Sequence, residues 1–336
     1  MTQRVTHKIV GPRRHGVVQF GFALHAALQL QRCSSELLWF PSVTDLISDP
    51  GSESGLVHTH FTDRLFGSTP AAAASAFSVL ARTVRANGSM LSVTLHDLPQ
   101  SSDGAHYNSR IQAYRRVCSL CDYIAVSSEH ERELMQENGI GIPGVSVIPL
   151  PIDPPKRCAV PLSHLPRTLG VFGFIYPGKG YEEIIAATKG LPADLQVLAI
   201  GASSPGHEGL VFDLRRAAAE LNTPFRVTGY VAGEELLPVL RGVTVPVAAH
   251  RHISASGSLN TWLSAGRRPL VPHTRYAAEF ERRNPGSLNV FADNLAGLCT
   301  AIRRALRDSA STWLPADVPL HPSPSEAAAA YAELFG

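Results

Sequence analysis

The sequence lacks a long apolar run. Its 336 residues are 44% hydrophobic and 17% charged, and no apolar stretch approaches the roughly 18 residues that cross a membrane. We therefore expect a soluble protein with no strong membrane signal. The length is more than one ordinary α/β core needs, and it predicts two domains of roughly 150 residues each.

An excess of charge of one sign is also lacking. Residues 1–150 hold 12 Lys+Arg and 12 Asp+Glu, so the remainder holds 30 − 12 = 18 and 28 − 12 = 16. Neither half is a basic surface, which argues against nucleic acid or anionic lipid as a partner. Lysine is rare among the basic residues, and only four occur: Lys8, Lys156, Lys179 and Lys189.

Cysteine is sparse and scattered. There is no signal peptide pattern at Met1, so we expect a reduced, cytoplasmic compartment. Cys118 and Cys121 have CxxC spacing, but they lie late in a helical pattern without a second Cys or His pair. This favours buried structural thiols over zinc or redox chemistry, and we predict no metal site. The five cysteines are Cys33, Cys118, Cys121, Cys158 and Cys299.

Strand and helix patterns alternate along the chain, which predicts an α/β fold. In the first half, strands are expected at 5–10, 37–40, 55–58, 91–99, 122–128 and 145–155, with helices at 17–30, 70–86, 109–120 and 129–138. Three prolines within 151–155 predict a semi-rigid linker. Beyond it, strands are expected at 168–174, 195–201, 225–227 and 243–249, with helices at 181–188, 211–221, 234–240 and 259–265.

Residues 243–271 carry the first candidate site. A buried strand over 243–249 leads through a Ser/Gly-rich turn into a helix from Leu259. Backbone N–H groups at a helix start lie at the positive end of the helix dipole and bind anions. The alternative is that Ser256 or Ser258 is a simple N-cap and Gly257 a turn residue. The candidate phosphate ligands are Ser254, Ser256, Gly257, Ser258 and Leu259.

A second candidate is the GFIYPGKGYEEI stretch at 173–184. It also runs from a strand through a turn into a helix, and glycines flank Lys179 so that the backbone can approach a ligand closely. A lone loop lysine is commonly a solvated side chain. Together with the SASGS loop, however, Lys179 predicts a cation and a helix end directed at one diphosphate.

Two further candidates lie in the first half. The strand at 91–99 contains His96 and Asp97 at its carboxyl end, where ligands bind in open α/β sheets. The alternative for His96 is a strand-end hydrogen bond to a neighbouring carbonyl. The loop from Gly11 to Gly16 lacks GxGxxG, so it gives no dinucleotide fingerprint, and Gly16 matters only if a ligand reaches it.

Several motifs together resemble a known family. GFIYPGKGYEEIIAA, VTGYVAGEEL and SAGRRPLV, preceded by HGV, VTLHD, AVSS and VIPLPID, stand in the order found in retaining glycosyltransferases of family four. The likeness spans most of 11–271. It implies the GT-B fold, in which two Rossmann-like domains face across a cleft. Residues 1–153 would be the acceptor-binding domain, 165–318 the donor-binding domain, and a C-terminal helix near 320–336 would cross back to the first.

The resemblance also implies a function and its residues. The chain would move a hexose, with mannose from GDP-mannose favoured over UDP- or GDP-glucose, to a hydroxyl of a saccharide acceptor. It would be a cytoplasmic enzyme, without cofactor or metal, which extends an intracellular (methyl)mannose polysaccharide and can form a homo-oligomer. Lys179 and the loop would hold the diphosphate, whose departing phosphate takes the acceptor proton. His96 would orient the sugar, Gly16 would approach the phosphate, and the nucleotide would meet Tyr230, Asn260 and Thr261.

The chain departs from the family pattern at two places. Phe174 stands where the family often has an arginine, and Ile253 and Thr261 stand where a pair of glutamates is usual. These departures keep other functions open: a non-catalytic GT-B partner subunit and a pseudo-glycosyltransferase that joins non-sugar rings. A nucleotide-sugar 2-epimerase is a further alternative, but it should offer carboxylates near the phosphate loop.

Overall fold

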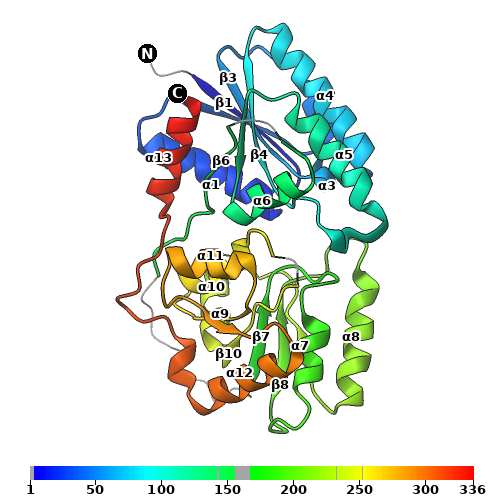
Figure 1. Cartoon of the computed structure of the whole chain (residues 1–336), viewed down its shortest axis with the longest axis vertical. Helices are drawn as coiled ribbons and strands as arrows, with labels where there is room; N and C mark the ends of the chain where they lie inside the picture. Colours follow the sequence, from blue (N-terminus) through cyan, green and yellow to red (C-terminus); the bar gives the residue numbers. More distant parts are fainter. Residues whose placement is uncertain (1–3, 142–143, 156–166, 232, 252) are drawn as a thin grey trace. The chain divides into compact units, whose positions relative to one another are not determined.

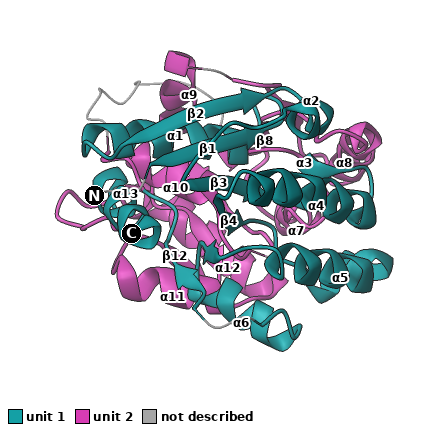
Figure 2. Ribbon diagram, turned by 90° about the horizontal axis from the view of Figure 1, so that it is seen from above, with its two compact units in different colours: residues 1–151, 322–336 teal, residues 152–321 magenta. Residues whose placement is uncertain are grey.

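The chain folds into two compact units in a computed structural model that describes all residues except 1–3, 142–143, 156–166, 232 and 252. Unit 1 comprises residues 1–151 and 322–336, and unit 2 comprises residues 152–321 (Figure 2). Lys156 and Cys158 lie outside the described residues.

Unit 1 is built on a parallel sheet of six strands in the order β2-β1-β3-β4-β5-β6. Every residue of β1 and β3 is buried, as expected for a parallel sheet that helices cover on both faces. The strands are β1 (Val5–Val10), β2 (Ser35–Phe40), β3 (Leu56–Phe61), β4 (Met90–Leu95), β5 (Tyr123–Val126) and β6 (Ser146–Val147).

Different helices cover the two faces of this sheet. On one face, α4 (Pro70–Ala86) and α5 (Tyr107–Cys118) enclose an aromatic and aliphatic core (Figure 1). On the other face, α1 (Gly16–Leu30) packs against α13 (Pro324–Phe335), which brings the end of the chain back to unit 1. The remaining α-helices of the unit are α2 (Val43–Ser48), α3 (Asp63–Phe66) and α6 (Glu129–Glu137).

Unit 2 repeats the plan with shorter strands. A parallel sheet in the order β10-β7-β8-β9 is extended by the pair β11 and β12 through a bridge from Val247 to Leu270. The strands are β7 (Thr168–Phe172), β8 (Gln196–Ile200), β9 (Phe225–Val227), β10 (Val245–Pro246), β11 (Leu270–Pro272) and β12 (Asn289–Phe291). The helices are α7 (Tyr181–Ala187), α8 (Glu208–Glu220), α9 (Leu236–Gly242), α10 (Gly257–Ser264), α11 (Arg275–Arg283) and α12 (Leu295–Arg307).

The predicted α/β class is confirmed, but several predicted strands were too long. The strand predicted at 91–99 ends at Leu95 as β4, so His96 and Asp97 follow the strand. The apolar run at 243–249 is buried throughout, but only Val245–Pro246 form β10, and Val247 already bridges to Leu270 on the other side. The stretch at 145–155 contributes only β6 (Ser146–Val147), because its prolines lack the N–H that a sheet ladder requires. Among the described residues, no helix is both long and apolar enough to cross a bilayer.

Of the CxxC pair, Cys118 is buried as the sequence predicted, whereas Cys121 is only partly buried. Cys118 is buried and free, and burial raises the pKa of its thiol to about 12. Cys121 donates its S–H to the backbone oxygen of Val117, 3.4 Å away. Both thiols stay protonated at neutral pH, so neither is a reactive thiolate.

Candidate anion-binding site

The site in unit 2 lies where the strand order of the sheet reverses. The chain moves from β7 outward to β8 and β9, and then returns to the other side of β7 to form β10. The loops after β7 and β10 therefore leave neighbouring strands at their carboxyl ends. In open α/β sheets this switch point is where ligands bind.

Lys179 is the central side chain of the site. Lys179 is only 3% exposed. Its Nζ donates to the Ser258 Oγ at 3.3 Å and lies 5.5 Å from the centre of the Tyr176 ring. Burial lowers the pKa of the Lys179 ammonium to about 7. No acidic side chain in the described part of the chain pairs with Lys179. The fold has thus buried a cation without its own counter-charge.

Glycines bring the two loops into contact. Gly180 has φ 91°, and a Cβ there would lie 2.2 Å from the backbone oxygen of Ala249. Gly173 has φ 111°, and its Cβ would lie 3.0 Å from the Nζ of Lys179. The N–H of Arg251 donates to the backbone oxygen of Gly178 at 3.1 Å. Only a residue without a side chain allows this close approach at Gly180.

The start of α10 completes the site. Ser256 is its N-cap, and its Oγ accepts from the N–H of Leu259 at 3.1 Å. The Leu259 N–H thus donates to the cap in this structure, and its contact with a phosphate stays a prediction. The N–H groups of Gly257 and Ser258 belong to the first turn, where a helix offers no acceptor. The hydroxyls of Ser256 and Ser258 lie 3.1 Å apart beside them.

Gly257 is not a strained turn residue. It is the first residue of α10 and its φ is not positive. A Cβ at this position would meet nothing within 4 Å. A side chain at this position would therefore point into open space at the helix start. Ser254, the remaining loop candidate, is buried.

The nucleotide-binding candidates occupy two places in unit 2. Asn260 is buried on α10, and the Thr261 hydroxyl on the same helix donates to the Gly257 backbone oxygen at 2.8 Å. Tyr230 follows the edge strand β9, which β8 separates from β7, and it is 44% exposed. The structure thus brings Asn260 and Thr261 to the helix of the anion site, and places Tyr230 at the end of another strand.

His250, which follows β10, is a residue of the site that no sequence motif indicates. Its ring is buried, and its Nε2 has no hydrogen-bond partner among the described residues. Burial and the neighbouring Lys179 hold the pKa of His250 well below its usual range. One buried imidazole and one buried ammonium thus lie close together, and no acidic side chain among the described residues pairs with the ammonium. The sequence does not predict this pair, because His250 and Lys179 are far apart along the chain.

In unit 1, His96 follows β4 and is 7% exposed. Its Nε2 lies 3.2 Å from the Nδ1 of His60, so the two rings share one hydrogen bond. Burial lowers the pKa of His96 to about 4, which keeps the ring neutral although Asp97 acts in the opposite direction. A neutral ring with one nitrogen engaged leaves the other to contact a ligand.

Gly16 is the first residue of α1. The Nδ1 of His15, the N-cap, accepts from the N–H of Val17 at 3.3 Å, and a Cβ on Gly16 would meet nothing within 4 Å. This helix start is open to a ligand, as Gly257 is in unit 2.

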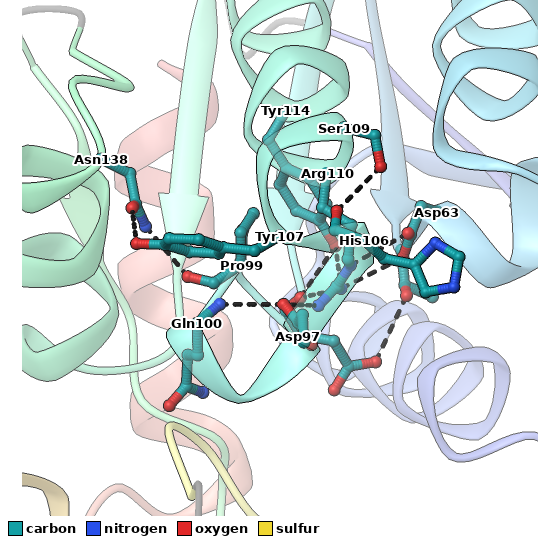
Figure 3. Close-up of polar contacts among 12 residues, drawn as sticks. Asp63, Asp97, Pro99, Gln100, His106, Tyr107, Ser109, Arg110, Tyr114 and Asn138 are labelled. Atoms are coloured by element: carbon teal, nitrogen blue, oxygen red, sulfur yellow. Dashed lines mark hydrogen bonds and ion pairs between the residues drawn. The ribbon is translucent and has the colours of Figure 1, made fainter.

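A network missed by sequence reasoning holds the backbone of His96 and Asp97, and Figure 3 shows it around Asp97, Arg110 and Tyr114. Asp97 has φ 50°, which is unusual for a residue with a side chain. The Tyr114 hydroxyl donates to the backbone oxygen of His96 at 2.6 Å, and Arg110 donates to that of Asp97 at 2.5 Å. Arg110 also pairs with Asp63 at 3.0 Å and with Asp103 at 2.6 Å. Helix α5 therefore fixes the turn that presents His96.

Known structures similar to this chain identify its fold. No family model and no curated protein sequence matches the chain. HepE of Anabaena, solved with UDP and glucose, matches with a TM-score of 0.71 and 13% identity over 98% of this chain and 95% of HepE. Sucrose-phosphate synthase of Thermosynechococcus elongatus matches with 0.67 and 14% identity over 99% and 94%. The lipopolysaccharide outer core galactosyltransferase WaaB matches with 0.61 and 9% identity over 99% of both chains.

The chain has the GT-B fold. At 9–14% identity, these similarities concern the fold and not individual residues. Within this GT-B chain, Ile253 is buried in an apolar cluster and Thr261 bonds to its own helix, so neither supplies a carboxylate to the anion site. Phe174 is half-exposed and adds no second cation beside Lys179.

Proposed function

We propose that this chain is a glycosyltransferase that moves a hexose from a nucleoside diphosphate sugar to a hydroxyl of a saccharide acceptor. The GT-B fold supports the proposal, because the matched structures include a galactosyltransferase and a protein solved with UDP-glucose. The residues of unit 2 supply the reason to assign the same class of ligand to this chain.

One observation carries the proposal. A buried ammonium without a carboxylate costs several kcal/mol in ordinary proteins, and such a group lowers its pKa or acquires an anion. Lys179 is such a group, and it lies within hydrogen-bond distance of the first turn of α10. A diphosphate would supply the missing negative charge to Lys179 and to the helix start together, beside the neutral His250 ring. Perturbed cations in this arrangement are typical of functional sites.

Retention at the sugar carbon is part of the same proposal. The bond between C1 and the diphosphate oxygen breaks, and the acceptor oxygen forms a bond on the same face. The acceptor proton passes to the departing phosphate. Lys179 and the N–H groups of Gly257 and Ser258 stabilise the negative charge that develops on the phosphate, and no metal ion is assigned to that role.

The finer assignments belong to the same proposal. Mannose from GDP-mannose is the favoured donor, UDP- or GDP-glucose the second choice, and an intracellular mannose polysaccharide the acceptor. Residues 1–153 would bind the acceptor and 165–318 the donor. His96 would orient the sugar, Gly16 would approach the phosphate, and Tyr230, Asn260 and Thr261 would contact the nucleotide.

A non-catalytic partner subunit is the second candidate. The observation in its favour is that Ile253 and Thr261 place no carboxylate at the anion site. Such a subunit would bind a nucleoside diphosphate but would not turn over a donor by itself.

A donor panel tests both candidates. The full chain is incubated with GDP-mannose, GDP-glucose, UDP-glucose and UDP-galactose plus mixed oligosaccharide acceptors, and the released nucleoside diphosphate is measured. We expect one donor to be consumed, and Lys179→Ala to reduce its turnover by about 10²–10³-fold, the usual cost of removing one transition-state donor. Lys189→Ala is the matched control, because Lys189 is exposed in the same unit.

Each outcome of the panel has a meaning. Turnover by the wild type that Lys179→Ala abolishes supports the proposal, and NMR of the product anomer tests retention. Nucleotide binding without turnover favours the partner subunit. If neither binding nor turnover occurs, or if Lys179→Ala turns over normally, the proposal is wrong.

A further inference from the structure

Three buried histidines gather on one face of the unit 1 sheet. His7 on β1 is the direct parallel neighbour of His58 on β3, and His60 lies two residues further along β3 on the same face. The rings of His7 and His58 are 5.4 Å apart between centroids, and those of His58 and His60 are 5.0 Å apart. No local sequence pattern indicates this cluster, because His7 and His58 are 51 positions apart along the chain.

The cluster holds donors and acceptors that the protein leaves unused. Neither nitrogen of His7 has a hydrogen-bond partner among the described residues, and neither has the Nε2 of His60. Both residues are at least 98% buried, so water does not replace the missing partners at the surface. Buried polar groups are paired in most proteins, and three exceptions in one cluster need an explanation.

The partners that do exist orient the rings. The Nδ1 of His58 is 3.0 Å from the Ser92 Oγ, and the Nδ1 of His60 is 3.2 Å from the Nε2 of His96. The Nε2 of His58 is 3.2 Å from the Thr94 Oγ1, but that hydroxyl has a second partner in the Tyr331 hydroxyl at 2.9 Å. The Nε2 of His58 can therefore be released while Thr94 stays bonded. Metal-binding histidines are typically held in this way through their other nitrogen.

We propose that His7, His58 and His60 bind a divalent metal ion of the zinc class. One nitrogen from each ring lies within 4.8 Å of the other two. Ligands of a tetrahedral Zn²⁺ at bonds of 2.0–2.1 Å are about 3.4 Å apart, so the rings need to close by no more than about 1.4 Å. A water molecule would be the fourth ligand, since the three histidines supply only three.

The chemistry of the cluster selects the class of metal. The three side chains are all histidine rings, and a neutral imidazole binds a metal ion through a nitrogen lone pair. Imidazole suits Zn²⁺, Co²⁺, Ni²⁺ and Cu²⁺, whereas Mg²⁺ and Ca²⁺ require oxygen ligands. His25 lies next to His7, with 5.6 Å between ring centroids, and is only partly buried, so it marks the side nearest to solvent.

A bound metal would also fix the state of His96. With the Nε2 of His60 on the metal, its Nδ1 carries the proton and donates it to the Nε2 of His96. The proton of the neutral His96 ring then lies on its Nδ1. The metal is assigned to ordering unit 1 and not to the diphosphate. This inference does not depend on the proposed glycosyl transfer.

Metal binding by the full, metal-stripped chain tests the inference. We expect one equivalent of Zn²⁺ to bind with micromolar or tighter affinity, and one equivalent of Co²⁺ to give the intense visible absorption of a tetrahedral site. The melting temperature should rise by several degrees with Zn²⁺ and should not change with Mg²⁺. The cobalt spectrum needs no variant and is read on the wild type.

His7→Phe is the deciding variant, because replacing this ring removes two unpaired polar atoms and no hydrogen bond shown by the structure. It should fold, and without metal it should melt no lower than the wild type, but its affinity for Zn²⁺ should fall at least 100-fold. His106→Gln is the control for weak surface binding, since His106 is exposed. Absence of a tetrahedral cobalt spectrum in the wild type would overturn the inference, and so would equal zinc binding by wild type and His7→Phe.

Discussion

At the scale of one residue, the burial of Lys179 destabilises its charged form, and a bound anion would offset that cost. An ammonium that is buried without a counter-charge is pushed toward its neutral form, and the pKa of Lys179 is accordingly lowered to about 7. An anion beside it reverses the effect by favouring the charged form. Ligand binding and protonation of Lys179 are therefore coupled.

This coupling predicts proton uptake when a nucleoside diphosphate binds. At pH 8.5 Lys179 is mostly neutral in the free protein, and the bound diphosphate raises its pKa toward the usual range, so about one proton is taken up per binding event. Calorimetry in buffers with different heats of ionisation measures this number directly. The His250 ring is neutral at this pH and does not add to it.

Lys179→Met is the matched variant for this measurement, because its side chain has similar length and no charge. It should bind the diphosphate more weakly and without proton uptake. Equal uptake by the variant would assign the proton to another group, and no uptake by the wild type would mean that Lys179 does not meet the phosphates.

At the scale of secondary structure, the site depends on where α10 begins. Gly257 is its first residue, its φ is not positive, and its missing side chain leaves open space. We expect Gly257→Val to weaken nucleoside diphosphate binding by at least tenfold, since the new side chain would occupy the place beside the first N–H groups. The melting temperature should change only slightly.

Gly209→Val is the control for Gly257→Val. Gly209 lies in the first turn of α8, also without a positive φ and with open space where a Cβ would be. It should change stability by a similar amount and leave diphosphate affinity unaltered. If Gly257→Val binds like the wild type, the start of α10 is a helix cap and not a phosphate site.

The turn after β4 depends in the same way on α5. Arg110 is largely buried and pairs with Asp63, which is also buried. Arg110→Met leaves that carboxylate without its partner and should lower the free energy of unfolding by about 3–5 kcal/mol. Arg85→Met removes an exposed pair with Asp122 and should cost at most about 1 kcal/mol. Chemical denaturation compares the two, and similar losses would contradict the account of the turn.

Local order explains which elements could be predicted. Lys179 and the Ser256–Ser258 loop were identified because a strand, a glycine-containing turn and a helix follow one another within a few residues. Strands β10, β11 and β12 have only two or three residues, too few to show a period, so β11 and β12 were missed and β10 was drawn too long.

Contacts between distant residues explain what could not be predicted. Arg110 and Asp63 are 47 residues apart, and His60 and His96 are 36 apart. No pattern within a single segment indicates such a pair. The cap at Ser256 shows the opposite case, since the sequence allowed both a cap and a phosphate ligand, and the structure assigns the Leu259 N–H to the cap.

At the scale of the whole molecule, two kinds of cation have different roles: Lys179 stabilises the phosphates, and the proposed metal ion orders unit 1. Lys179 and the helix start are assigned to the phosphates, so glycosyl transfer should continue after Mg²⁺ and Mn²⁺ are removed with EDTA. Turnover before and after chelation measures this. Activity that is lost and restored by Mg²⁺ would contradict the proposed chemistry. Activity restored only by Zn²⁺ would point to the histidine cluster of unit 1.

The central claim is that a nucleoside diphosphate binds at Lys179 and the start of α10. A crystal structure of the full chain with GDP or UDP tests it most directly. The account predicts phosphate oxygens within hydrogen-bond distance of the Lys179 Nζ and of the N–H groups of Gly257 and Ser258. A diphosphate bound elsewhere, with the Lys179 Nζ still bonded only to Ser258, would contradict it.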